Sequence, residues 1–378
     1  MESRWKTFLK KPIMLSVMAV IFGFLAAMVI MALAGYNPFA SIGSLFIGMF
    51  GSPKRFFNIF IKSTPIIFTG IGVAFAIKTG LFNIGAEGQF IMAEIAAVLV
   101  GITVHLPAFL EIPLIILAAA VAGGLYGGLV GWLKAKFGIN EVITSIMLNW
   151  IALYFSNWIC GLSAFAGAGS STQKIDAAGY TTILNTWKRT DGMETLMNGG
   201  PLARAFLKTD VNIGFPAAIA AALLISWLLY KTRRGFELRA VGFNKDAAKF
   251  TGINVNRSIV EAMIISGALC GLGAAFYITG QWPHCISTLT NFEGYGLNGL
   301  SVAFIAMSSP IGCLFAGLLF GGLLYGGSTL QLVMGVPTEI INIIIGIIVF
   351  FCALTYILPK FIDRLGTKKL KKGGAANV

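Results

Sequence analysis

The sequence has little charge: only 11% of its 378 residues are Asp, Glu, Lys or Arg, whereas a soluble protein carries about 25%. Hydrophobic residues make up 57% instead, and apolar runs of spanning length recur between residues 13 and 358. This composition excludes a soluble fold and predicts an all-α protein with several membrane spans. The first run, residues 13–35, is longer than the apolar part of a signal peptide, so we expect it to remain as the first span.

Histidine and cysteine are also scarce. The two histidines, His105 and His284, fall in different predicted outer loops, and we expect both to lie at the surface. The five cysteines have no paired spacing and are interpreted as small buried hydrophobes. No G-x-x-x-x-G-K-[ST] phosphate loop occurs, so this chain alone should not hydrolyse ATP. The sequence thus predicts no catalytic residue, no metal site and no cofactor in this chain.

The basic residues are unevenly distributed. We assign 20 of the 28 Lys and Arg residues to one side of the membrane, most of them in residues 1–12, 231–257 and 359–378. This positive-inside pattern predicts that both termini are cytoplasmic and that anionic lipid is a neighbour. No basic stripe alternates with aromatic residues, so nucleic acid is not a predicted partner.

Ten spans agree with this charge pattern. They cover residues 13–35, 56–77, 82–104, 112–133, 139–161, 212–230, 258–280, 294–309, 310–327 and 338–358. The predicted organisation is a cytoplasmic N-terminus (1–12), a transmembrane domain (13–358) and a basic cytoplasmic tail (359–378). Residues 162–211 form a long outer loop, and residues 231–257 form the largest inner segment. The run GGLYGGLVG in the fourth span should let helices approach closely.

Two of these spans are interrupted by glycine and polar residues. The apolar run after residues 80–89 (GLFNIGAEGQ) is only 15 residues long, so a spanning helix must begin near residue 82. Asn83, Glu87 and Gln89 would then lie at membrane depth, where polar groups indicate function; the alternative is a loop at the membrane surface. A similar stretch, NFEGYGLNG at residues 291–299, precedes another short span in the opposite predicted direction. Such an inverted repeat of interrupted helices is typical of a transport site.

Neutral amides dominate the candidate substrate path. Its residues are Asn83, Glu87, Gln89, Asn149 and Asn298. Amides suit a neutral, hydroxylated substrate, although each could instead only hold helices together. We favour the holding role for Glu94, Glu261 and Glu339. An isolated ionised Glu87 would be costly, so it should be protonated or hydrogen-bonded by backbone amides.

The inner segment contains a predicted short helix, residues 245–251. Asn244 suits its N-cap, Asp246 its first turn and Gly252 its C-terminal stop. A solvated basic loop would explain the charges but not a capped helix with an apolar face. We therefore interpret it as a docking helix for a cytoplasmic partner. The apolar face consists of Ala247, Ala248 and Phe250.

Four segments resemble one protein family. They are GLFNIGAEGQF (80–90), GINEVITSIMLNWIA (138–152), RGFELRAVGFNKDAAKFTGI (234–253) and ISGALCGLGAAF (265–276). They are similar to the permease subunits of bacterial nucleoside and simple-sugar ABC importers, within the branched-chain amino acid and ribose permease superfamily. The resemblance runs from about residue 59 to residue 358, and NIGAEGQ with NEVITSIMLN is specific to the nucleoside branch.

The resemblance implies a type II ABC importer fold in the bacterial cell (inner) membrane. It implies a heterodimer with a second permease, cytoplasmic ATPase subunits that hold ATP and Mg, and an extracellular substrate-binding lipoprotein. In that family the segment matching residues 239–253 contacts the ATPase. Its residues here are Arg239, Asn244, Asp246, Ala247, Ala248, Phe250 and Gly252.

The expected function is import of nucleosides by alternating access, as a transport subunit and not an enzyme. A ribose-like simple-sugar permease is an alternative, because both substrate classes offer hydroxyl groups. An ion-coupled secondary transporter is a further alternative and would need Glu87 as its ion or proton site. A membrane-embedded enzyme is a third, with no sequence feature in its favour.

Overall fold

The computed structural model describes residues 12–353, which form helices and, outside them, only isolated β-bridges. The predicted N-terminal and C-terminal cytoplasmic segments fall almost entirely outside the described residues. The chain divides into two compact units. The larger unit is Met49–Tyr325, and the smaller one combines the residues before and after it.

Each of the ten predicted spans overlaps a helix, and residues 354–358 of the last span lie outside the described residues. The overlapping helices are α2 (Pro12–Leu33), α4 (Pro53–Lys78), α5 (Ala86–Thr103), α6 (Ala108–Phe137), α7 (Glu141–Gly161), α11 (Gly214–Lys231), α14 (Val255–Gly280), α15 (Tyr295–Ile305), α16 (Pro310–Met334) and α17 (Thr338–Ala353). Seven helices in the described part of the chain are long and apolar enough to cross a membrane, and α15 is among the shorter apolar ones. The polytopic all-α fold is therefore confirmed.

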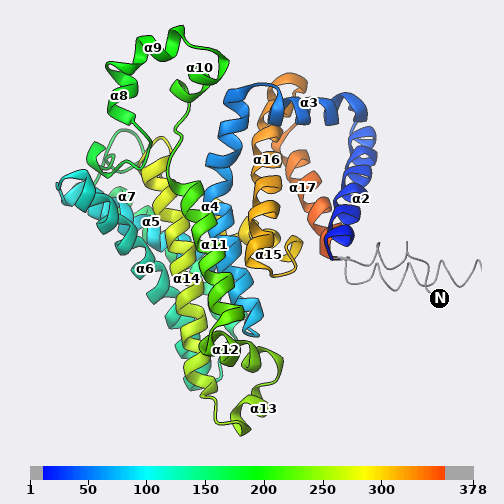
Figure 1. Cartoon of the computed structure of the whole chain (residues 1–378), viewed down its shortest axis with the longest axis vertical. Helices are drawn as coiled ribbons and strands as arrows, with labels where there is room; N and C mark the ends of the chain where they lie inside the picture. The colour runs from blue at the N-terminus through cyan, green and yellow to red at the C-terminus, as the bar shows by residue number, and fades with distance from the viewer. Residues whose placement is uncertain (1–11, 354–378) are drawn as a thin grey trace, which may run out of the picture. The chain divides into compact units, whose positions relative to one another are not determined.

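In the larger unit, α4 lies at the centre and packs against α11, α14 and α15 (Figure 1). Helices α6 and α14 pack directly against each other, and both carry glycines at their contact. A Cβ added to Gly123 or Gly127 would collide with backbone of α14, and one added to Gly267 or Gly271 would collide with α6. The glycine-rich run of α6 thus permits the close approach that the sequence predicts.

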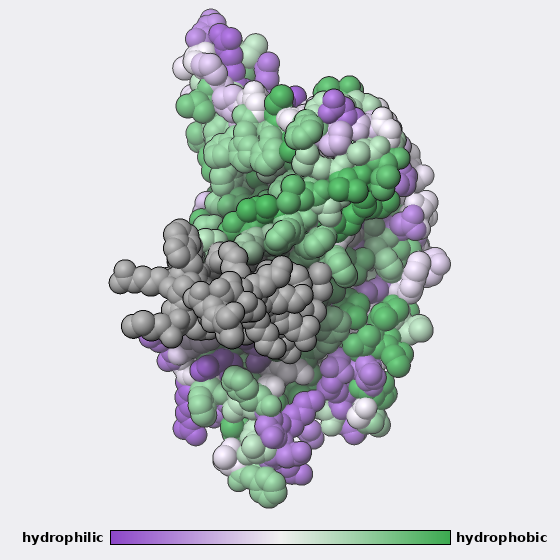
Figure 2. All heavy atoms as spheres, turned by 90° about the vertical axis from the view of Figure 1, so that its right-hand side faces the viewer, coloured by the Kyte–Doolittle hydropathy of each residue, from purple (hydrophilic) through white to green (hydrophobic). Residues whose placement is uncertain are grey.

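The two ends of the larger unit hold the segments between spans. One end carries α8 (Asn185–Arg189), α9 (Gly192–Asn198) and α10 (Pro201–Leu207), and the opposite end carries α12 (Arg233–Phe243) and α13 (Lys245–Phe250) (Figure 1). Figure 2 shows hydrophilic side chains gathered at both ends. The separation agrees with the predicted assignment of residues 162–211 and 231–257 to opposite sides of the membrane.

In the smaller unit, α2 packs against α17. A Cβ added to Gly23 would lie 2.7 Å from the Cα of Ile348. Residues 36–55, expected outside or along the interface, contain the helix α3 (Pro38–Phe50). The side chain of Asn37 accepts hydrogen bonds from the amides of Phe39 and Ala40 and so caps this helix.

The predicted surface position of His284 is wrong. His284 is only 5% exposed, its ring stacks on Tyr180 at 3.8 Å, and its Nδ1 lies 2.8 Å from the carbonyl oxygen of Ile278. Burial lowers the pKa of His284. The long loop causes this burial because it folds back: the amide of Thr172 donates to Ile286, and that of Ile175 donates to His284.

His105 is exposed, as predicted, and lies 3.2 Å from Asp176. The cysteines are also as expected where their side chains are described. Cys160, Cys270, Cys285 and Cys313 are free and buried.

Candidate functional site

The stretch 80–89 is a buried break between two helices. Helix α4 ends at Lys78, and Gly80 has φ +77°, a conformation that favours glycine. Helix α5 begins at Ala86, four residues later than the predicted start near residue 82. Every residue from 81 to 89 is buried or half-buried, so the stretch is not an exposed loop.

Glu87 joins the two interrupted segments. Its Oε1 accepts a 2.7 Å hydrogen bond from the amide of Gly294, and its Oε2 accepts from Gly296 (2.7 Å) and Leu297 (3.1 Å). These amides belong to the start of α15, where backbone N–H groups lack partners within the helix and favour negative charge. The predicted bonding of Glu87 to backbone amides is confirmed. The two similar stretches, 80–89 and 291–299, are in direct contact.

Asn83 and Gln89 form a closed amide pair. The Asn83 amide nitrogen donates to Gln89 Oε1 at 2.9 Å, and the Gln89 amide nitrogen donates to Asn83 Oδ1 at 3.1 Å. Asn83 also donates to the hydroxyl of Ser266 in α14, and that hydroxyl donates to the carbonyl of Gly72 in α4. Both amides are fully buried. They fasten the interrupted segment to α4 and α14.

Asn149 supports the same segment from α7. Its Oδ1 accepts from the amide of Gly88 at 2.8 Å, and its side-chain nitrogen donates to the carbonyl of Ile84 at 3.1 Å. Asn298 differs from the other four candidate path residues. It is half-buried, and its side chain makes no hydrogen bond to any described residue.

A second polar cluster was missed by sequence reasoning. Glu94 is 2% exposed and lies seven residues after Glu87, on the same face of α5. Its carboxyl group interacts electrostatically with that of Glu293. Glu94 Oε1 and Glu293 Oε2 have no hydrogen-bond partner among the described residues. Two signals pointed here: the seven-residue spacing from Glu87, and the position of Glu293 inside the repeated stretch.

Aromatic rings lie next to this carboxyl pair. Tyr295 of α15 stacks on Phe90 of α5, with ring centroids 5.1 Å apart. The ring centroids of Tyr277 in α14 and Tyr295 lie 4.8 Å apart. Three helices therefore contribute one ring each to a common aromatic cluster.

The predicted helix in the inner segment is confirmed as α13. Asn244 Oδ1 accepts hydrogen bonds of 3.0 Å from the amides of Asp246 and Ala247. The helix ends at Phe250, one residue earlier than predicted, and Gly252 has φ +83°.

The predicted apolar face of α13 is wrong in one respect. Ala248 is 3% exposed and points into the protein, whereas Ala247 and Phe250 are exposed. The reason is helical geometry, since residues 247 and 250 share a side that residue 248 does not. Phe250 is 92% exposed, and Phe243 at the end of α12 is 88% exposed. We call these two side chains the phenyl pair.

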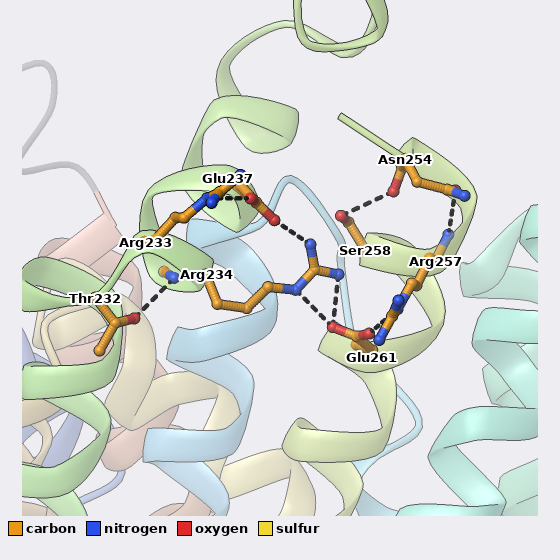
Figure 3. Close-up of polar contacts among 9 residues, drawn as sticks. Thr232, Arg233, Arg234, Glu237, Asn254, Arg257, Ser258 and Glu261 are labelled. Atoms are coloured by element: carbon orange, nitrogen blue, oxygen red, sulfur yellow. Dashed lines mark hydrogen bonds and ion pairs between the residues drawn. The ribbon is translucent and has the colours of Figure 1, made fainter. Parts of the chain in front are cut away.

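Helix α12 was not predicted, and it is fastened to its neighbours by arginines. Arg239 donates from Nε to the carbonyl of Leu229 at 3.0 Å and lies over the ring of Tyr230, which ties α12 to α11. Arg234 donates to Glu261 of α14 at 2.6 and 2.8 Å and also pairs with Glu237 (Figure 3). Glu261, expected to hold helices together, does so through ion pairs.

The far end of α12 touches the interrupted segment. A Cβ added to Gly242 would lie 2.6 Å from the carbonyl oxygen of Lys78 and 2.9 Å from the amide nitrogen of Gly80. One added to Gly80 would lie 2.8 Å from the Cα of Gly242. This backbone contact places α12 directly on the turn between α4 and residues 81–85.

The chain is similar to known proteins along most of its length. A family model described as "Branched-chain amino acid transport system / permease component" matches residues 55–353. The guanosine ABC transporter permease NupP of Bacillus subtilis is 35% identical over 96% of this chain and 98% of its own length. The nucleoside ABC transporter permease NupB of Lactococcus lactis is 34% identical over the same shares.

A more distant relative is the glucose ABC transporter permease TsgB13 of Haloferax volcanii, 29% identical over 90% of this chain and 86% of its own length. No solved structure matches the chain. The family model covers well over half of the chain, and both the helical fold and the relatives agree with it. This multi-pass membrane protein belongs to the family of branched-chain amino acid transport system permease components.

Proposed function

We propose that this chain is the permease subunit of an ATP-driven importer that carries nucleosides across the bacterial inner membrane. The observation that carries this proposal is the pair of relatives named for guanosine and nucleoside transport, which match nearly the full length of both chains. The glucose permease relative supports a simple sugar as the second candidate substrate.

The proposed complex contains a second, different permease. Two further relatives support this: NupQ of Bacillus subtilis and NupC of Lactococcus lactis are each 28% identical and come from the same species as NupP and NupB. Cytoplasmic ATPase subunits would bind ATP and Mg, and an extracellular lipoprotein would deliver substrate. The chain itself then needs no cofactor.

The ATPase docks, in this proposal, on α12 and α13 at the cytoplasmic end. The phenyl pair supports this role, because two almost fully exposed phenyl rings beside basic residues suit a partner with an apolar pocket and acidic rim. Four other predicted coupling residues would hold this face in shape and would not insert into the partner. They are Arg239, Asn244, Asp246 and Gly252. Residues 162–211 would then lie outside, and both termini inside.

Movement of α12 would reach the substrate path through the Gly242–Gly80 contact. The hydrogen bonds of Asn83, Gln89, Glu87 and Asn149 hold α5 and α15 to the interrupted segment, so these parts move together. Access would alternate as this group shifts relative to the rest of the bundle. Asn298, with its unbonded amide, is the predicted path residue most available to a substrate.

The ion-coupled alternative has less support. It would use Glu87 as its ion or proton site, yet both carboxylate oxygens of Glu87 already accept backbone hydrogen bonds from α15. Proton or ion exchange at Glu87 would release the start of that helix.

The test is uptake of labelled guanosine, uridine and ribose into vesicles that hold the complete complex. We expect ATP-dependent uptake of a nucleoside, and little uptake of ribose. ATP-dependent uptake of ribose alone would favour the sugar permease. Uptake that continues without ATP and follows a proton gradient would contradict the importer.

A further inference from the structure

The carboxyl pair Glu94–Glu293 has buried oxygens without a hydrogen-bond partner among the described residues. The nearby Glu87 uses both its oxygens on backbone amides. Glu94 Oε1 and Glu293 Oε2 instead have no partner in the described part of the chain, although Glu94 is 2% exposed. Buried polar atoms normally find partners, so a pair that lacks them is suited to a ligand.

The chemistry of the pair fits a neutral ligand with hydroxyl groups. Two neighbouring buried carboxyl groups repel each other when both are ionised, so we expect the pair to carry at most one negative charge. Lys62 of α4 attracts Glu293 electrostatically. Free carboxyl oxygens accept hydrogen bonds from hydroxyl groups, and adjacent acceptors suit a vicinal diol.

The aromatic cluster supplies a second, different kind of contact. Tyr277 and Tyr295 come from two helices and lie beside Phe90, which is one helical turn before Glu94 on α5. Planar heterocycles stack on such rings. Polar acceptors and aromatic surfaces thus occur together.

The position of the carboxyl pair in the fold also suits a substrate-binding site. Glu94 lies midway along α5, and Glu293 opens the second interrupted segment just before α15. Sites of transporters lie near the middle of the membrane at interrupted helices. The pair therefore lies beside the contact that Glu87 makes between the two repeated stretches.

We propose that Glu94 and Glu293, with Tyr277 and Tyr295, form a nucleoside-binding site in which the carboxyl groups bind the ribose hydroxyls and the rings contact the base. This inference rests on the proposed function and narrows it, because it says which part of the substrate each group recognises. It separates the site from Glu87, Asn83 and Gln89, which support the helices around it.

The test compares guanosine with 2′,3′-dideoxyguanosine in vesicles that hold the complete importer. Glu94→Gln and Glu293→Gln should raise the KM for guanosine about tenfold or more, because each change replaces one acceptor oxygen for a substrate hydroxyl with an NH2 donor. Uptake of the dideoxy compound should change much less. Tyr295→Phe keeps the ring and should affect guanosine less than Tyr295→Ala does.

The matched control is Glu111→Gln. Glu111 is another buried carboxyl with an unpartnered oxygen, but it lies in the first turn of α6, a helix that contributes neither a carboxyl nor a ring to the proposed site. This variant should not alter the ratio of guanosine to dideoxyguanosine uptake. Membrane abundance is measured for every variant.

Two results would overturn the site: unchanged kinetics in both Gln variants, or an equal loss for guanosine and its dideoxy analogue together with lower abundance. The second result would mean that the pair only fastens residues 281–294 to α5. Failure of the proposed function is recognised separately, because the wild-type complex would then take up neither compound.

Discussion

The interrupted segment before α5 and the α12–α13 face differ in which side chains are buried and which are exposed. At the interrupted segment, Asn83, Glu87 and Gln89 are fully buried, and each is hydrogen-bonded to protein. At the α12–α13 face, charges lie in partly exposed ion pairs and the phenyl pair is exposed. Buried polar groups thus build the first region, whereas exposed apolar groups point to a partner at the second.

The Gly242–Gly80 contact connects these two regions. Substitutions in the interrupted segment should mainly affect folding. Substitutions at the α12–α13 face should mainly affect coupling to ATP. Variants can separate these two outcomes.

Glu87→Ala should have the largest effect. It removes three hydrogen bonds from the start of α15, each with a net value of about 1 kcal/mol, so the total approaches 3 kcal/mol. We expect lower membrane abundance and a lower unfolding temperature of the purified chain in detergent. Glu87→Gln keeps one acceptor oxygen and should lose less. Normal abundance with selective loss of uptake would instead place Glu87 in contact with substrate.

Gly242→Val should have the second-largest effect, which is a loss of nucleoside uptake. Its new side chain would meet backbone atoms of Lys78, Thr79 and Gly80, which cannot yield as a flexible side chain can. Overpacking of this kind costs about 1–3 kcal/mol. We expect nucleoside uptake to fall sharply while ATP hydrolysis by the complex continues. Gly161→Val is the matched control, since a Cβ there has no neighbour within 4 Å; equal effects of the two variants would contradict a specific contact.

Phe250→Asp and Phe243→Asp should leave stability nearly unchanged, within about 0.5 kcal/mol, because both side chains are exposed. Binding of the ATPase subunits, measured by co-purification, and ATP-dependent uptake should both fall. Leu202→Asp, at an exposed apolar position of α10 at the opposite end of the larger unit, is the control. Full ATPase binding by the double Asp variant would exclude the phenyl pair from docking.

Arg234→Ala should have only a small effect on stability. Its ion pairs with Glu237 and Glu261 are partly exposed, so we expect a loss of about 0.5–1 kcal/mol that shrinks at high salt. Thermal unfolding of Arg234→Ala, Glu261→Ala and the double variant measures the coupling between the two residues. Additive losses would show that this pair does not fasten α12 to α14.

Local sequence signals were sufficient for many elements. Long apolar runs correctly placed the spanning helices, and Asn244 with Gly252 correctly placed α13. The start of α5 was wrong because residues 81–85 find hydrogen-bond partners elsewhere, such as the Asn149 side chain on Ile84. The polar helices α8–α10 and α12 carry no apolar run of spanning length, so hydropathy could not reveal them.

By itself, the sequence determined that this protein is a bundle of membrane helices with two similar interrupted segments and a capped inner helix. These features depend on neighbours within a few residues along the chain. The tertiary structure alone decided which polar groups have partners. Glu87 and Glu94 lie on the same face of one helix, yet Glu87 caps α15 and Glu94 meets another carboxyl. That difference comes from residues some 200 positions away, and no local pattern can encode it.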